Sequence, residues 1–524
     1  MGGGGLGGSD RIHDLDGSAM NTDGFSSIIL SLVTFAPLAG GVLLMFFPRR
    51  DRDIRIFALV ISLLTFVLSL HLPVHFQRSQ TDFQYEIDRQ WVSTPNIHYH
   101  MGVDGISLWL VVLTTFLTPL CVLISWTSIH ERVKEFFILL LILETALIGV
   151  FTSLDLFLFY FFWEATLIPM ALLIGIFGHE RKVYAAVKFF MYTMIASVFM
   201  LAAILWLYAH TGSFDFVVIR DQIMRGAIPQ FPAAAQWLFL GFFLAFAVKI
   251  PLFPFHTWLP DAHVEAPTAG SVLLAGVLLK MGTYGLLRFN LGLFPEQARH
   301  NAWWVITLAL IGIIYGALVA MVQPNMKKLI AYSSVSHLGF VVLGIFSFTQ
   351  AGLNGAMFVM LAHGISTGGL FMLAGLLHER RHTYEISEFG GLASPMPVYA
   401  SSFLIILLAS AGLPLLNGFI GEFLVLSGSF QAKAVYGILA ATGVIWSAAY
   451  LLWMYQRVFY GKVTHSANNS LSDLTAFEKI AIWPCAAAAV VMGVAPIVWL
   501  GAIDPAVQAA LTPFTRVASK MVGQ

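Results

Sequence analysis

The feature that most constrains this chain is a series of long apolar runs that hold almost no charge. Each run has about twenty residues, the length that an α-helix needs to cross the hydrocarbon core of a bilayer. The runs do not alternate between apolar and polar residues, as the strands of a membrane β-barrel would. They therefore predict an all-α integral membrane protein with about fourteen transmembrane helices. The predicted spans are 26–47, 54–73, 105–128, 135–151, 154–178, 184–209, 233–268, 269–290, 302–322, 328–347, 352–377, 397–430, 434–456 and 478–501.

The composition excludes most soluble classes of protein. Of the 524 residues, 58% are hydrophobic and only 11% are charged, whereas a soluble domain has roughly 25% charged residues. The 28 basic residues balance the 28 acidic ones, so there is no basic face for nucleic acid. Cys121 and Cys485 are too few for a disulfide framework or a cysteine-bound iron–sulfur cluster. We therefore expect a chain that lies in the lipid bilayer and binds no nucleic acid.

Basic residues predict the orientation of the chain. Sixteen Lys and Arg residues lie at one set of alternate loops and ten lie on the opposite side. Because cytoplasmic loops carry the excess of basic residues, this difference predicts that both termini lie outside. The Gly-rich first 24 residues have no apolar core of the kind that a signal peptide has. Their G-x-G-x-x-G match (Gly3, Gly5, Gly8) follows no strand, so we interpret it as a product of composition.

Several ionisable residues fall inside the apolar runs. A charge at the centre of a bilayer costs about 2.5–3.5 kcal/mol on insertion scales. Buried ion pairs that only tie helices together are an alternative explanation, but such pairs seldom offset their own desolvation. Because so many of these groups lie in one bundle, we favour a path for protons. The residues are Glu144, Glu164, Lys249, Lys280, His337, His363 and Glu422.

Two of the runs are too long for one straight helix and contain helix breakers. In 233–268, Lys249 is followed by Pro251, Pro254 and Pro260, and in 397–430 a stretch rich in Gly and Pro, 412–421, precedes Glu422. Proline removes a backbone N–H and clashes with the preceding turn. Discontinuous helices at matching positions of two halves are a sequence signal for a transport site. We therefore expect two broken helices, the seventh and the twelfth, beside the proton path.

The spacing of the buried charges indicates an internal repeat. Lys249 and Glu422 are 173 positions apart, and so are Glu164 and His337. About five helices fit in that length, and because five is odd the second copy would be inverted in the membrane. The predicted divisions are an N-terminal extension (1–24), the first three helices (25–130), the first five-helix repeat (131–290), the second, inverted repeat (301–460), and a final loop, helix and tail (461–524).

Five segments resemble one family, the antiporter-like subunit M of respiratory NADH:quinone oxidoreductase, complex I. The similarity runs from about residue 100 to 460. The segments are HTWLPDAHVEAPTAGSVLLAGVLLKMGTYGLLRF (256–289), FLFYFFWEATLIPM (157–170), KKLIAYSSVSHLGF (327–340), MLAHGISTGGLFMLAGLLHERRHTYEISEFGGL (360–392) and NGFIGEFLVLSGSF (417–430).

The resemblance implies fourteen transmembrane helices that include two inverted five-helix repeats, with helices 7 and 12 broken. It also implies a role for each path residue. Glu164 and Lys249 would form a coupled pair in the first repeat. Lys280, with His337 and His363, would link the repeats, and Glu422 would be the exit-side group. Glu at position 422, where the related subunits L and N have Lys, favours subunit M. Glu144 is outside the family's commonly cited path, so its role stays open.

The resemblance also implies the setting in which the chain works. It would be a proton-translocating membrane-arm subunit in the inner membrane of a bacterium, with L-like and N-like subunits as neighbours. Electrons would pass from NADH to quinone in other subunits, which would hold NAD, FMN, iron–sulfur clusters and quinone, and this chain would hold no cofactor. Two alternatives remain open. One is a subunit of a multi-subunit Na⁺/H⁺ antiporter or membrane-bound hydrogenase, and the other is a structural spacer.

Three further groups of residues have competing interpretations. His378–His382 matches the H-E-x-x-H zinc pattern, but its two middle arginines suit a charged helix end. The polar residues after the first helix break, His256, Asp261, His263 and Glu265, could take up protons or be solvated loop groups. Asp104 and Asp155, at predicted helix starts, are interpreted as caps or as partners of the helix dipole.

Overall fold

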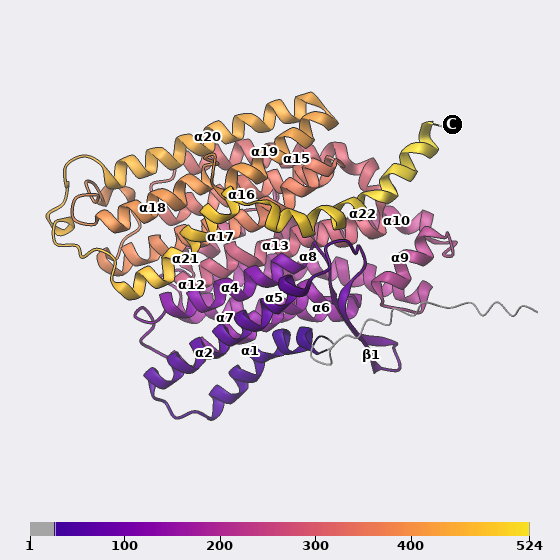
Figure 1. Ribbon diagram of the computed structural model, residues 1–524, viewed down its shortest axis with the longest axis horizontal. Coiled ribbons are helices and arrows are strands. Elements are labelled where there is room, and N and C mark those ends of the chain that lie inside the picture. The colour runs from indigo at the N-terminus through magenta and orange to yellow at the C-terminus, as the bar shows by residue number, and fades with distance from the viewer. Residues whose placement is uncertain (1–25, 27, 523–524) are drawn as a thin grey trace, which may run out of the picture.

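The computed structural model describes residue 26 and residues 28–522, with side chains described as far as residue 514. The predicted extension, 1–24, lies outside the described residues. Thirteen helices in the described part are long and apolar enough to cross a membrane. They lie side by side in one bundle, with the N-terminal helices at one edge and α15–α20 at the other (Figure 1). The prediction of an all-α membrane bundle is confirmed.

The first half of the chain forms the helices that flank and contain the first break. The helices before it are α1 (Ile29–Phe46), α2 (Asp51–Ser69), α3 (His71–His75), α4 (Leu108–Ile124), α5 (Val133–Thr152), α6 (Leu156–Ala165), α7 (Leu167–Phe177), α8 (Lys182–Thr211) and α9 (Phe216–Met224). The broken helix is α10 (Phe231–Lys249) and α11 (Trp258–Glu265), followed by α12 (Thr268–Leu273), α13 (Leu279–Gly285) and α14 (Leu291–Leu293).

The second half has a matching break. Its helices are α15 (Pro295–Met321), α16 (Met326–Phe346), α17 (Gln350–Arg381), α18 (Pro397–Ser410), α19 (Asn417–Ala432), α20 (Ala434–Phe459), α21 (Ala476–Val494) and α22 (Ile497–Val522). The two long apolar runs are thus interrupted where predicted, at residues 250–257 and 411–416. Both breaks contain a proline, which cannot donate a helical hydrogen bond. Two of the predicted repeat boundaries lie inside helices, 290 within the helical span Thr268–Leu293 and 301 within α15, and the inverted symmetry stays a prediction.

Two elements differ from the predictions. The C-terminal boundary of the predicted last span, 478–501, is wrong, because α21 ends at Val494 and a separate helix, α22, begins at Ile497. Pro496, which lies between them, interrupts the backbone hydrogen bonds but not the hydrophobicity. In addition, β1 (Gln84–Val92) and β2 (Ile97–Val103) form an antiparallel hairpin at one end of the bundle. No strand was predicted there.

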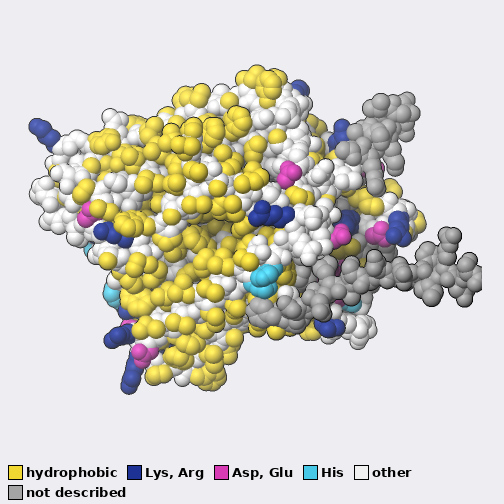
Figure 2. Space-filling view, viewed as in Figure 1, with side chains coloured by type: hydrophobic (Ala, Val, Ile, Leu, Met, Phe, Trp, Pro, Cys, Tyr) yellow, Lys and Arg dark blue, Asp and Glu magenta, His cyan; other side chains and the backbone are white. Residues whose placement is uncertain are grey.

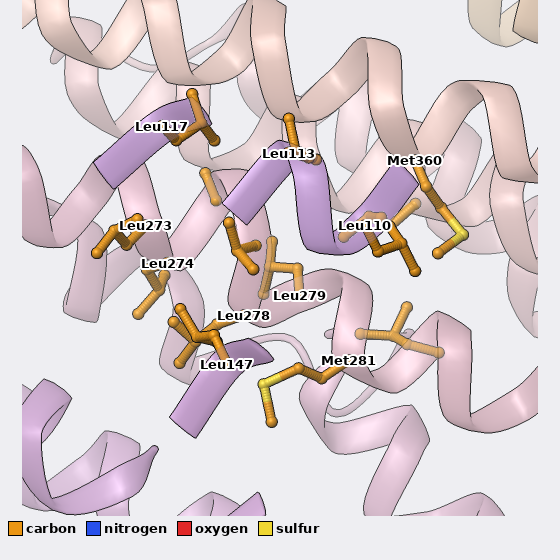
Figure 3. Close-up of a cluster of buried hydrophobic side chains, with 14 of the residues drawn as sticks. Leu110, Leu113, Leu117, Leu147, Leu273, Leu274, Leu278, Leu279, Met281 and Met360 are labelled. Atoms are coloured by element: carbon orange, nitrogen blue, oxygen red, sulfur yellow. The ribbon is translucent and has the colours of Figure 1, made fainter. Parts of the chain in front are cut away.

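Apolar side chains cover both the interior and the surface of the bundle. Hydrophobic side chains dominate the face shown in Figure 2, and exposed ones include Trp237 and Ile445. In water such a surface would be unstable, whereas lipid contacts it readily. The interior is packed around α12–α14 and α17, whose apolar windows are fully buried. Figure 3 shows part of this core, a set of leucines and methionines from α4, α5, α12–α13 and α17.

Candidate functional site

The first pair of predicted path residues lies on α6 and α10. Asp155 caps α6, since its Oδ1 accepts hydrogen bonds from the backbone N–H groups of Phe157 and Leu158 at 2.8 and 3.0 Å. This cap confirms the interpretation of Asp155. It starts the helix that carries Glu164, the residue before the last of α6. Lys249 is the last residue of α10, at the edge of the break.

Lys249 is fully buried, and its ammonium faces aromatic rings. Its Nζ lies 5.5 Å from the ring centroid of Trp163 and 5.3 Å from that of Phe189. The electron-rich face of an aromatic ring attracts a cation. In the described part of the chain, Nζ has no hydrogen-bond partner, and neither has Oε1 of Glu164. Glu164 is the acidic group whose charge acts on Lys249, so the two residues interact across space without direct contact.

Lys280 lies at the centre of the bundle in a distorted helix. Five-residue π-helical turns precede and follow α13, at 274–278 and 286–290. A π-helical turn replaces the α-helical hydrogen bonds with bonds between residues five apart, and such turns are frequent at functional sites. The Lys280 ammonium donates hydrogen bonds to the carbonyl oxygen of Ala275 and to Nδ1 of His363, the latter at 2.8 Å. Lys280 is therefore tied to α17 in the second half.

The helices of Lys249 and Lys280 touch each other at a glycine. A Cβ atom placed on Gly282 would lie 2.8 Å from the carbonyl oxygen of Phe246 and 3.0 Å from the backbone nitrogen of Ile250. Such distances leave no room for a side chain. The end of α10 therefore packs backbone to backbone against α13, which places the two lysines on adjoining helices.

The second half brings its predicted residues into direct contact. Nδ1 of His337, on α16, lies 3.0 Å from Oε1 of Glu422, on α19. The ring centroids of His337 and His363 are 5.7 Å apart. All three side chains are buried, with about 4% of each residue exposed. Lys280, His363, His337 and Glu422 thus form one buried row through four helices.

The other residues singled out from the sequence are placed differently. Glu144 is fully buried on α5 and faces Thr118 of α4, apart from the row. His256, His263 and Glu265 are buried, so the interpretation as solvated loop groups is wrong for these three. Asp261 pairs with Lys188 at 2.7 Å. Whether any of these residues takes up protons stays a prediction.

The H-E-x-x-H match is part of a stacked aromatic group. The ring of His378 is stacked on that of Tyr384, with centroids 4.2 Å apart. Within the described residues, no group of three or more His, Cys, Asp or Glu side chains could hold a metal ion.

A buried ion pair was missed in the sequence. Arg288, on the π-turn after α13, donates hydrogen bonds to both oxygens of Asp104 at 2.8 and 2.5 Å. Burial alone would raise the pKa of Asp104, but the guanidinium holds that pKa below its ordinary value. Asp104 also accepts hydrogen bonds from the N–H groups of Ile106 and Ser107, which lie in the turn before α4. Because α4 begins at Leu108, with Ser107 as its N-cap and no side-chain cap, the interpretation of Asp104 as a cap is wrong. The sequence did contain a signal for this pair, because Arg288 is a second basic residue in the predicted span 269–290, eight positions after Lys280.

A second missed cluster fastens the hairpin to the bundle. His100, on β2, contacts Asp215 at the start of α9 through Nδ1 and Glu86 of β1 through Nε2, the latter at 2.8 Å. Burial lowers the pKa of His100, but the two carboxylates outweigh this effect and raise it to about 9. The backbone N–H of His98 donates to Asp155 at 3.0 Å. The hairpin, α9 and the start of the Glu164 helix are thus joined at one end of the bundle.

Two family models match the sequence. One, described as NADH:quinone oxidoreductase/Mrp antiporter, covers residues 153–447, and the other, described as NADH-ubiquinone oxidoreductase chain 4, amino terminus, covers residues 32–150. NADH-quinone oxidoreductase subunit M from Rhodobacter capsulatus is 46% identical over 493 residues, which are 91% of this chain and 95% of that protein.

Solved structures share the fold. A chain of respiratory complex I from Thermus thermophilus with bound NADH superposes with a TM-score of 0.83 and 33% identity, over 92% of this chain and 99% of that one. A chain of the Mrp complex from Dietzia sp. DQ12-45-1b has a TM-score of 0.81 over 94% of this chain and 99% of that one. Its identity is only 18%, so this second likeness concerns the fold alone.

Proposed function

The chain belongs to the subunit M family of NADH:quinone oxidoreductases, and on that premise we propose that it moves protons across the membrane as the antiporter-like M subunit of such a complex. The chain contributes to an enzyme without carrying out its redox chemistry. Electrons pass from NADH to quinone in other subunits, which hold the NAD, FMN, iron–sulfur clusters and quinone. This chain sits among L-like and N-like membrane subunits in the inner membrane of a bacterium, with both termini outside.

The observation that carries this proposal is the row of buried ionisable side chains. Lys280 and His363 share a hydrogen bond of 2.8 Å, and His337 and Glu422 lie 3.0 Å apart. Each of these groups can gain or lose a proton, and His does so near neutral pH without any perturbation. An intramembrane ionisable residue costs free energy unless it serves a path or a pair. The arrangement suits stepwise proton transfer.

The two halves of the path have different tasks. Lys249 gains or loses its charge in response to Glu164, because a nearby opposite charge favours the charged form of each. A change in the neighbouring subunit that draws Glu164 away or neutralises it makes Lys249 release its proton. The proton moves towards Lys280 on the adjoining helix. From there His363, His337 and Glu422 carry it outward.

A Na⁺/H⁺ antiporter subunit is the alternative with the same fold, since the Mrp chain superposes almost as well as the complex I chain. Sequence favours the oxidoreductase. The amino-terminal model is described as chain 4 of the NADH–ubiquinone enzyme, and identity is 46% to subunit M against 18% to the Mrp chain.

The test is transport by the purified complex in sealed vesicles. NADH and quinone should drive proton uptake or release that an uncoupler abolishes and that does not depend on Na⁺. Isolation of the chain with cation-antiporter subunits, or Na⁺ transport without NADH oxidation, would contradict the proposal. If a complex with neutral residues at both Lys249 and Lys280 pumps protons at the wild-type rate, the chain would instead be a structural spacer.

A further inference from the structure

One lysine that lies between two predicted spans in the sequence is enclosed by the bundle in the structure. Lys327 is the second residue of α16 and is only 1% exposed. Lysine is almost never fully buried unless its ammonium is paired. Its Nζ donates hydrogen bonds to the carbonyl oxygens of Ala266 at 2.6 Å and of Val264 at 3.4 Å, and the ring centroid of Tyr384 lies 5.1 Å away. The main partners of this buried ammonium are therefore backbone carbonyl groups.

These two carbonyl groups lie at the end of a very short helix. α11 has eight residues, Trp258–Glu265, and is interrupted from α10 on one side and from α12 on the other. A helix of this length is not stable by itself, and the last carbonyl groups of any helix have no partner within it. A cation at this end satisfies those carbonyl groups and interacts favourably with the helix dipole. Lys327 thus supplies, from α16, an interaction that α11 cannot make within itself.

Further contacts fix the same end of α11. Oε2 of Glu265 accepts a hydrogen bond from the backbone N–H of Arg181 at 2.8 Å. The carbonyl oxygen of Glu265 accepts another from the N–H of His179 at 3.0 Å, and the carboxylate charge acts on Lys327. Arg181 and His179 belong to the first half of the chain, whereas Lys327 belongs to the second. The end of α11 is therefore held between the two halves.

The position of α11 matters because it connects the two lysines of the proposed path. Its first residue, Trp258, donates its indole N–H to the carbonyl oxygen of Val248 at 2.9 Å, directly before Lys249. Its last residue leads through Pro267 into α12 and then into the helix of Lys280. A movement of α11 would change the separation of Lys249 and Lys280. Misplacement of a reacting group by about 1 Å can cost roughly 10²-fold in rate.

We propose that Lys327 is a positioning residue, which holds α11 from the second half of the chain and so fixes Lys249 and Lys280 relative to each other. Its task is to hold the helix, and it does not relay a proton. The inference rests on the proposed function, because the transfer from Lys249 towards Lys280 gives the position of α11 its importance. The second half of the chain thereby supports a transfer step that begins in the first half.

The test compares three variants of the intact complex. Lys327→Met removes the ammonium and keeps a long side chain. Lys327→Arg keeps a cation with N–H donors, but it cannot relay a proton, because a guanidinium is not deprotonated in proteins. Lys328→Met is the matched control, since Lys328 is the next residue, is half-buried, and contributes to the cap of α16 through its backbone N–H, which donates to Asn325 at 3.0 Å.

Two quantities are measured for each variant. The first is proton translocation driven by NADH in sealed vesicles, with NADH oxidation by an artificial acceptor as the check on assembly. The second is the rate of amide hydrogen exchange in the peptide that contains residues 258–266, followed by mass spectrometry. Exchange reports directly on how firmly α11 is held, whether or not protons are pumped.

We expect Lys327→Met to speed exchange in 258–266 and to slow proton translocation, each about three- to tenfold, the equivalent of about one hydrogen bond. Lys327→Arg should restore most of both, and Lys328→Met should change neither. Unchanged exchange in Lys327→Met overturns the proposal, and so does an equal effect in Lys328→Met. Faster exchange with unchanged pumping also overturns it, since α11 would then be held without consequence for transfer. If Lys327→Arg pumps as slowly as Lys327→Met, a cation that only holds the helix is not sufficient, and the positioning role is wrong.

The failure of this inference can be told apart from the failure of the proposed function. If Lys249→Ala stops pumping while Lys327→Met changes neither quantity, the path stands and the positioning role is wrong. If Lys249→Ala pumps at the wild-type rate, the path through Lys249 is wrong, and the exchange data still decide whether Lys327 holds α11. In a double variant, Lys327→Met should not slow Lys249→Ala further, because a residue that acts through another is not additive with it.

Discussion

The two helix breaks hold their charged residues in opposite ways. At the first break, Lys249 faces aromatic rings and is separated from Glu164, without a hydrogen-bond partner in the described residues. At the second, Glu422 contacts His337 directly, and His363 contacts Lys280. An ammonium that contacts only aromatic rings can gain or lose its proton when a neighbouring charge moves. A row of hydrogen-bonded groups can instead pass a proton from one group to the next. The first break is thus suited to switching and the second to transfer.

Removal of the switching charge should have the largest effect. Lys249→Ala should lower NADH-driven proton translocation at least about tenfold, since a positioned proton-transfer group contributes roughly 10²–10⁴-fold. Electron transfer from NADH to an artificial acceptor reports whether the complex still assembles. Lys433→Ala, at an exposed lysine between α19 and α20, is the control. Full pumping in Lys249→Ala would remove Lys249 from the mechanism.

A double variant tests whether the first break works as a coupled pair. If Glu164 acts only through Lys249, Glu164→Gln combined with Lys249→Ala should be no slower than Lys249→Ala alone, because residues that act as a unit are not additive. If the fold-loss in the double variant equals the product of the two single fold-losses, Glu164 and Lys249 act independently. The contrast between the two breaks would then disappear.

The second break should tolerate a change of charge better than a loss of it. Glu422→Gln can still accept a hydrogen bond from His337 but cannot carry a proton, so we expect proton translocation to fall about three- to tenfold. Glu422→Lys keeps an ionisable group and should retain substantial pumping. Initial rates of acidification in vesicles measure both. A variant Glu422→Lys as slow as Glu422→Gln would mean that the sign of the charge matters as much as its ability to titrate.

The sequence predicts the elements of this comparison but not their geometry. Apolar length and helix breakers are local properties, so the spans and both breaks could be placed from the sequence, and so could Lys249 and Glu422 beside them. Which side chains meet depends on packing between helices far apart in sequence. Nothing in the local pattern distinguishes His337, which touches Glu422, from Glu164, which does not touch Lys249.

The missed features share a physical cause. Arg288 and Asp104 are 184 positions apart, and the hairpin around His100 is short and polar, so neither has a strong local signal. The boundary between α21 and α22 lies inside a run that stays apolar across Pro496.

The aromatic rings around Lys249 offer a finer test of the first break. Trp163→Leu removes the closest indole face, and a cation–π contact is worth about 0.5–1 kcal/mol or more when desolvated, so proton translocation should fall about two- to fivefold. Trp163→Phe keeps a ring and should lose less. Trp303→Leu, at a tryptophan that is 66% exposed, controls for general effects on the bilayer contact. Equal rates for Trp163→Leu and Trp163→Phe would show that the ring contributes volume only.

The smallest expected effect concerns the His100 cluster, which lies beside Asp155 at the start of α6, the helix that carries Glu164. The pKa of His100 is raised from 6.5 to about 9, because Asp215 and Glu86 outweigh the effect of burial. A raised pKa in the folded state means that the charged pair stabilises the fold fully below about pH 6.5 and that this contribution is lost as the pH rises through 9. The unfolding midpoint of His100→Asn should therefore lie about 1–3 °C below that of the wild type at pH 6, and the difference should vanish by pH 9.5. His210→Asn, at an exposed histidine, should show no such trend. A difference that stays constant from pH 6 to 9.5 would mean that His100 stabilises by packing alone, and the hydrogen bond from His98 to Asp155 would then be the hairpin's polar contact with the helix that carries Glu164.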